Sequence, residues 1–149
     1  MSLDVSLISK EMRKPESSGI FIRDDGCTFE ISEEEWKKRN PGQTPVRLTE
    51  IEETNEVYSA NITHNLILMA KEAGIYKELW RPEEIGITKA KQLIEPLTKG
   101  LELLKSDRPR FESLNPDNGW GSYIGFVLWV GKYLSACVEY PEADVMVSR

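Results

Sequence analysis

Leu3-Asp4-Val5-Ser6-Leu7-Ile8 near the start of the chain and Asp144-Val145-Met146-Val147-Ser148 near its end share the pattern that decides the fold. In both stretches every second residue is aliphatic. Because successive side chains of a strand point to opposite faces, this alternation is typical of a strand with one buried face. We predict that the two terminal strands pair with each other or lie in one sheet, which ties down both ends of the chain.

The residues that follow the first strand predict a loop and then a hairpin. Residues 10–18 are mostly charged or small and predict the loop. Ile20-Phe21-Ile22 and Cys27-Thr28-Phe29-Glu30-Ile31 then flank Asp24-Asp25-Gly26. Asp-Gly between two apolar runs is typical of a hairpin, because its turn needs positive φ and both residues tolerate it.

A short helix is predicted after the hairpin. Ser32 and Glu35 have the spacing of a capping box, in which the serine hydroxyl accepts from the amide three residues on. The helix continues through Lys38 and is stopped by Asn40-Pro41-Gly42. Val46-Arg47-Leu48 and Asn55-Glu56-Val57-Tyr58 predict another pair of strands.

From Asn61 onward the apolar period becomes that of a helix, and we predict three main helices near 61–73, 88–105 and 122–140. Gly74 suits the positive-φ position after the first helix. Pro96 lacks a backbone donor and predicts a kink or break in the second. Residues 123–140 are apolar nearly all round, which predicts the central buried helix. The fold class is therefore α+β, an antiparallel sheet including both terminal strands packed on these helices, in one domain over residues 1–149.

Composition narrows the class of protein. The chain has 149 residues, 19 basic and 25 acidic side chains, a net charge of −6 and 40% hydrophobic residues, which suits one ordinary domain. An acidic balance argues against duplex nucleic acid and anionic membranes as partners. No apolar run reaches the roughly 20 residues of a spanning helix, and residues 1–10 lack a signal-peptide pattern. We expect a cytoplasmic protein that does not bind membranes.

Few residues are suited to catalysis or metal binding. His64 is the one histidine, and Cys27 and Cys137 lie far apart in the sequence, which favours free thiols over a disulfide or zinc site. The chain has no Gly-rich phosphate loop and no nucleophile or zinc-protease motif. We therefore expect no metal and no cofactor, and a catalytic role is less favoured than a non-catalytic one.

The first of three polar clusters is Asn61-Ile62-Thr63-His64-Asn65-Leu66, where a strand passes into a helix. Asn61 or Thr63 is a candidate N-cap, and the amides of a first helical turn can receive an anion or a carbonyl group. Two interpretations stay open. Either these side chains only cap the helix and bond to neighbouring backbone, or they line a ligand pocket as Asn61, Thr63, His64 and Asn65.

The second cluster is Leu79-Trp80-Arg81-Pro82-Glu83-Glu84-Ile85. Trp80 offers a stacking surface and Arg81 a planar cationic fork, which together suit a ligand with rings and anions. In the alternative interpretation a proline begins a short helix, Glu83 and Glu84 face its dipole, and Arg81 forms a structural ion pair.

The third cluster is the turn-rich loop Asn115-Pro116-Asp117-Asn118-Gly119-Trp120-Gly121-Ser122-Tyr123. Gly119 and Gly121 allow backbone amides to approach a bound group closely. The loop either binds a ligand or serves only to cap the next helix and bury Trp120. Its candidate ligand-binding residues are Asn115, Asn118, Trp120 and Tyr123.

The three clusters also carry a resemblance. Ala60-Asn61-Ile62-Thr63-His64-Asn65-Leu66, Met69-Ala70, Glu72-Ala73-Gly74-Ile75-Tyr76, Leu79-Trp80-Arg81-Pro82-Glu83-Glu84 and Asn115-Pro116-Asp117-Asn118-Gly119-Trp120-Gly121 occur in this order. In this succession the chain resembles a group of small uncharacterised bacterial and phage-encoded proteins over roughly residues 58–149. The resemblance implies a phage or mobile-element context and no particular activity.

Three functions fit these observations. The first is a non-catalytic module that binds a small polar or nucleotide-like ligand, such as a nucleotide-derived signal that it sequesters. The second is a structural or interaction protein without a ligand. The third is an enzyme for a small substrate, with His64 as general base and Glu83 or Glu84 as acid. The sequence also leaves open a homodimer, in which Phe21 and Trp36 serve either the contact or the core.

Overall fold

The computed structural model describes residues 1–13, 20–44 and 51–149. These residues form two compact units, one of Met1–Ser9 with Asn55–Arg149 and the other of Lys10–Thr54. Folding as the single domain expected from the sequence stays a prediction. The predicted α+β class is confirmed. Within the described ranges, no helix combines the length and the apolar character needed to cross a membrane.

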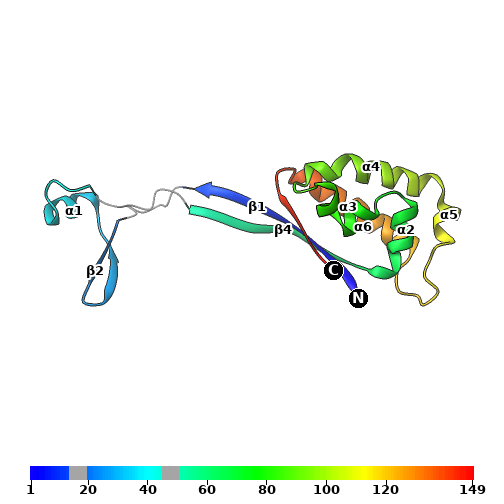
Figure 1. Cartoon of the computed structure of the whole chain (residues 1–149), viewed down its shortest axis with the longest axis horizontal. Coiled ribbons are helices and arrows are strands. Elements are labelled where there is room, and N and C mark those ends of the chain that lie inside the picture. Colours follow the sequence, from blue (N-terminus) through cyan, green and yellow to red (C-terminus); the bar gives the residue numbers. More distant parts are fainter. Residues whose placement is uncertain (14–19, 45–50) are drawn as a thin grey trace. The chain divides into compact units, whose positions relative to one another are not determined.

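The sheet of the first unit joins the two terminal strands, as predicted. Strand β1 (Ser2–Arg13) lies between β4 (Ile51–Thr63) and β5 (Asp144–Ser148) in the order β4-β1-β5. β1 and β5 are antiparallel, with Val5 opposite Val147 and Leu7 opposite Val145. Leu3, Val5 and Leu7 are fully buried because the helices cover this face of the central strand (Figure 1).

The helices of the first unit pack on that face of the sheet (Figure 1). The two longest, α4 (Lys91–Ser106) and α6 (Tyr123–Glu139), pack against each other, and their residues Leu93, Leu97, Phe126 and Val130 are fully buried. The elements are η1 (His64–Leu66), α2 (Ile67–Glu72), α3 (Tyr76–Trp80), η2 (Pro82–Ile85), α4 (Lys91–Ser106), α5 (Arg108–Glu112) and α6 (Tyr123–Glu139).

The first predicted helix begins later than expected. Asn61 belongs to β4, and the chain turns only at Thr63, whose side chain caps η1 by accepting from the Asn65 amide. Of the two N-cap candidates, Thr63 is therefore confirmed and Asn61 is wrong, because pairing with β1 keeps Asn61 in the sheet. Leu66, Met69, Ala70 and Ala73 are buried, as the helical apolar period predicts, and Gly74 follows α2 with φ +74° as expected.

Two expectations for the longer helices are corrected. The break predicted at Pro96 is wrong, because α4 runs unbroken from Lys91 to Ser106, and a kink there stays a prediction. Helix α6 is not buried all round, because Ile124, Leu128 and Val138 are 57%, 60% and 58% exposed. Its buried face carries Tyr123, Phe126, Val130, Tyr133, Ala136 and Cys137.

The second unit contains the predicted hairpin and short helix. Strands β2 (Phe21–Asp24) and β3 (Cys27–Glu30) pair antiparallel, and Asp25 and Gly26 in the turn have φ +48° and +77°. Helix α1 (Glu33–Arg39) follows, and the Ser32 hydroxyl accepts from the Glu35 amide at 3.2 Å. Phe21 is 50% exposed, so this side chain is not part of a buried core.

Two further predictions fall partly outside the described residues. The loop expected over residues 10–18 is wrong for residues 10–13, which belong to β1, while 14–18 lie outside the described residues. Of the second predicted strand pair, Val46-Arg47-Leu48 lies outside them as well. Its partner, residues 55–58, is part of β4.

Candidate ligand-binding site

The first and third polar clusters meet at one cavity of about 440 Å³ in the first unit. Asn61, Thr63 and Asn65 come from the end of β4 and the turn after it, and Trp120 comes from the loop before α6. The remaining lining residues, Met1 and Ser2, come from the start of the neighbouring strand β1. Three segments that are distant in the sequence therefore contribute to one hollow.

Asn61 is held by the neighbouring strand. Its Nδ2 atom donates to Oδ1 of Asp4 at 2.7 Å. A backbone hydrogen bond follows just after the end of β4, where the amide of His64 donates to the carbonyl of Met1 at 3.3 Å. The carboxylate of Asp4 thus orients the side-chain amide of Asn61.

The turn after β4 orients Asn65. Oγ1 of Thr63 accepts from the Asn65 backbone amide at 3.3 Å and from its Nδ2 atom at 3.0 Å. In both Asn61 and Asn65, the side-chain Nδ2 group donates a hydrogen bond within the protein. The Oδ1 atom of each side chain accepts no hydrogen bond from the described part of the chain. The cavity therefore offers acceptor oxygens to a ligand.

The glycines of the third cluster bring Trp120 to the cavity. Asn118 forms a side-chain turn, in which its Oδ1 atom accepts from the Trp120 amide at 2.9 Å. Gly121 has φ +105°, and a Cβ atom built on it lies 3.0 Å from both Thr63 Cγ2 and Leu66 Cγ. Glycine suits this position because its φ strains other residues and a Cβ atom would be tightly packed against the turn. Trp120 itself remains 71% exposed, so its ring is not a core residue.

Asn115 and Tyr123 have structural contacts instead. Oδ1 of Asn115 accepts from the Tyr123 amide at 2.7 Å at the start of α6. The Tyr123 hydroxyl donates to the carbonyl of Leu104 at 2.8 Å, and the residue is buried. Neither residue lines the cavity.

The second cluster does not join the other two at the cavity. Trp80 is 1% exposed and lies in the core, where Tyr76 stacks on it at a ring distance of 5.9 Å. Its Nε1 atom donates to Nδ1 of His64 at 2.8 Å. The first and second clusters are therefore connected by a part-buried hydrogen bond, and the buried Trp80 ring offers no stacking surface to a ligand.

This hydrogen bond also determines what His64 can do chemically. A neutral imidazole has one N–H donor and one acceptor nitrogen. Because Nδ1 accepts from Trp80, the neutral ring carries its hydrogen on Nε2 and has no second lone pair for a substrate proton. The geometry does not favour the general-base hypothesis for His64.

Arg81, Glu83 and Glu84 form ion pairs outside the cavity. Nε of Arg81 lies 3.9 Å from Oε2 of Glu84, and Nη1 of Arg149 lies 2.6 Å from Oε1 of Glu83. The pKa of Glu83 is lowered, first by its own backbone amide and then by Arg149. A carboxyl group held ionised in this way does not suit the proposed acid role.

The described residues contain no group of three or more His, Cys, Asp or Glu side chains that could hold a metal ion. Cys137 is buried, and burial raises the pKa of its thiol to about 12, so the thiolate needed for metal binding or nucleophilic attack is disfavoured. Cys27 is exposed.

Comparisons with known protein families, with curated proteins and with solved structures find no match for this chain.

Met1 and Ser2 carry no sequence pattern that indicates a site. The alternation in residues 3–8 predicts a terminal strand, but alternation does not say which strand lies beside it. Only the order β4-β1-β5 places the start of β1 next to Asn61.

Proposed function

We propose that this protein is a non-catalytic module that binds a small, flat, nitrogen-containing ring such as a nucleobase, in the cavity between Asn61, Asn65 and Trp120. The observation that carries the proposal is the composition of this cavity, which combines an exposed indole with two oriented amides. An indole stacks on any base, and stacking contributes about 1–3 kcal/mol per base.

The hydrogen-bonding groups narrow the ligand class. The Oδ1 atoms of Asn61 and Asn65 are acceptors, so they favour a ring that presents N–H or amino groups at its edge. Adenine, guanine and cytosine carry such an amino group. The Thr63 hydroxyl, which already accepts from Asn65, keeps its own hydrogen for a ligand acceptor.

The lining residues contribute no arginine or lysine side chain. Arg81, which the sequence suggested for anion binding, is not among them. The proposal therefore assigns recognition to the base or nucleoside part of a nucleotide-derived ligand, with any phosphate directed to solvent. A phage or mobile-element protein that sequesters a nucleotide-derived signal in the cytoplasm is the biological role that we propose for it.

Calorimetric titration of the purified full chain with the four common ribonucleosides tests the proposal. We expect Trp120→Ala to weaken binding about tenfold or more, because stacking is lost. Its free energy of unfolding is expected to change by less than about 0.5 kcal/mol, because the side chain is exposed. Asn65→Ala is expected to weaken binding as well, most strongly for the nucleosides with an amino group.

Arg81→Ala is the matched control, since Arg81 lies outside the cavity, and it should leave the affinity unchanged. Mass spectrometry of material released by heat from the purified protein identifies a ligand that it carries. Failure of every nucleoside to bind, or equal affinity of the wild type and Trp120→Ala, overturns the proposal. Turnover of an added nucleoside that is lost in His64→Ala also overturns it, in favour of an enzyme.

A further inference from the structure

The exposed face of α6 carries a regular row of residues that the fold of one chain leaves uncovered. Along the helix the spacing is four, three, four and three residues, which is the spacing of a seam between two packed helices. The outer members are bulky and largely exposed, and the two in the centre are small. The row consists of Ile124, Leu128, Gly131, Ser135 and Val138.

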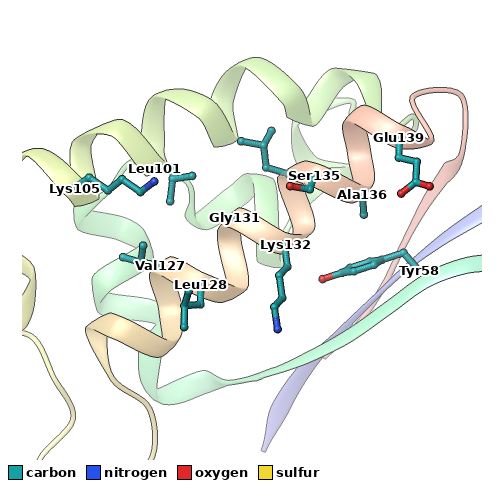
Figure 2. A pocket seen from close by; sticks show the side chains of 11 residues that line it. Tyr58, Leu101, Lys105, Val127, Leu128, Gly131, Lys132, Ser135, Ala136 and Glu139 are labelled. Atoms are coloured by element: carbon teal, nitrogen blue, oxygen red, sulfur yellow. The ribbon is translucent and has the colours of Figure 1, made fainter.

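The middle of this row forms the floor of a groove of about 720 Å³ (Figure 2). One side of the groove is α4 with Leu101, and the other is β4 with Tyr58. Gly131 and Ser135 leave the groove open at its centre, so a second helix can approach the backbone of α6 closely there.

The two ends of this groove carry side chains of opposite charge. Lys105 lies at the end near Val127, Glu139 lies at the opposite end, and Lys132 lies between them (Figure 2). None of the three charged side chains forms an ion pair with the rest of the described chain. The groove is therefore positive at one end and negative at the other.

We propose that this groove is occupied by α6 of a second copy of the chain, packed antiparallel about a two-fold axis midway between Gly131 and Ser135. In a two-fold interface, residue i contacts residue j of the partner and j contacts i. This axis places Gly131 opposite Ser135 of the partner subunit, so that small residues meet where the helices are closest. It also places Leu128 opposite Val138 of the partner subunit.

The charges of the groove complement themselves in this arrangement. An antiparallel partner brings its negative end over the positive end of the first groove, so Glu139 of one copy is level with Val127 and faces Lys105 of the other. The same contact forms twice because the axis is two-fold. A parallel pair would place like ends together and lose this complementarity.

The oligomeric state of the full chain by sedimentation velocity, from micromolar to submillimolar concentration, is the first test. We expect a dimer, and we expect Leu128→Glu to weaken it by about a hundredfold or more, because the substitution buries a charge beside Val138. Leu68→Glu is the matched control, since Leu68 is also 60% exposed but lies on α2. It should leave the dimer intact.

Gly131→Ala tests the dimer interface without disturbing the fold of the single chain. A Cβ atom on Gly131 meets only Leu101 Cδ2, at 4.0 Å, so the single chain accommodates it. At the closest approach of two helices, the added methyl group keeps them apart. We expect a folded protein whose dimer is weakened about tenfold or more.

Charge exchange and cross-linking test the orientation. Glu139→Lys and Lys105→Glu should each dimerise more weakly, and their mixture should form a heterodimer. In a Cys27→Ser background, Leu128→Cys mixed with Val138→Cys should form a disulfide between chains. Neither variant should form this disulfide alone, because in a dimer of one variant the introduced cysteines of the two copies lie ~15 Å apart along the helix axis.

A chain that stays monomeric throughout the concentration range overturns the proposal, and so does a dimer that Leu128→Glu and Gly131→Ala leave unchanged. Disulfide formation by Leu128→Cys alone overturns the antiparallel arrangement. Binding of another protein in the groove of a monomeric chain would likewise exclude the second copy as its occupant.

Discussion

Gly121 lies so close to Thr63 that a Cβ atom built on the glycine would be 3.0 Å from Cγ2 of the threonine. This contact joins the loop before α6 to the turn after β4, and it places Trp120 beside Asn65 at the cavity. Within the loop, the Trp120 amide donates to Oδ1 of Asn118 and fixes the local backbone. The cavity thus depends on a close approach at which a Cβ atom would be tightly packed and strained by the φ of +105°.

Gly121→Ala should destabilise the protein and weaken ligand binding. Its φ of +105° strains any residue with a Cβ atom, and the methyl group collides with Thr63 and Leu66, so we expect a loss of about 2–4 kcal/mol in the free energy of unfolding. Urea denaturation measures it. Gly119→Ala is the control: its φ is +77° but nothing lies within 4 Å, so a loss of only about 1 kcal/mol is expected. Equal losses in the two variants would show that the contact is unimportant.

His64→Ala should destabilise the fold by about 1–3 kcal/mol, because it leaves the buried Nε1 donor of Trp80 without its partner. In a Trp80→Phe background the donor is gone, and the additional cost of His64→Ala should be smaller. A double-mutant cycle by chemical denaturation gives the coupling. Additive effects would indicate that the hydrogen bond contributes little to stability.

Gly100→Ala should be destabilising although alanine favours helices. A Cβ atom on Gly100 would lie 2.4 Å from Cγ2 of the buried Ile75, and relieving such overpacking typically costs about 1–3 kcal/mol. Gly131→Ala, also inside a long helix, has no such clash and should gain about 0.5–1 kcal/mol. The thermal midpoints, measured at a concentration too low for dimers, should move in opposite directions. A stabilised Gly100→Ala would show that Ile75 and Gly100 are not closely packed.

Stability should fall in alkaline solution partly through Cys137. Burial raises the pKa of this thiol from 9.0 to about 12 and also raises the pKa of the Tyr133 hydroxyl. The unfolded chain therefore loses the thiol proton first, and stability decreases as the pH rises from about 9 to about 12. Each such group contributes about 1.4 kcal/mol per pH unit.

Cys137→Ala removes this contribution, so its unfolding free energy should fall less steeply by about that amount per pH unit when measured by urea denaturation. Thiol labelling gives a second measurement: at pH 8 the folded chain should react at Cys27, which is exposed, and not at Cys137. Identical slopes for the wild type and the variant, together with labelling at both sites, would contradict the burial of Cys137.

Local patterns in the sequence were sufficient for most of the elements. The alternation of Leu3, Val5 and Leu7 predicted a half-buried strand, and its pairing with the last strand is confirmed. The turn at Asp25-Gly26 and the cap at Ser32 were predicted equally well, because a few adjacent residues determine their backbone angles and hydrogen bonds.

Tertiary structure alone decided which of these elements meet. Asn61 lies in a strand and not at a helix cap because β1 pairs beside it, and periodicity cannot indicate a partner so distant in the sequence. Trp80 and Trp120 look alike in the sequence, yet one is buried against His64 and the other is exposed at the cavity. Burial depends on what the rest of the chain packs against a residue. The local sequence therefore indicated both tryptophans as candidate ligand contacts and could not show which of them lies in the core.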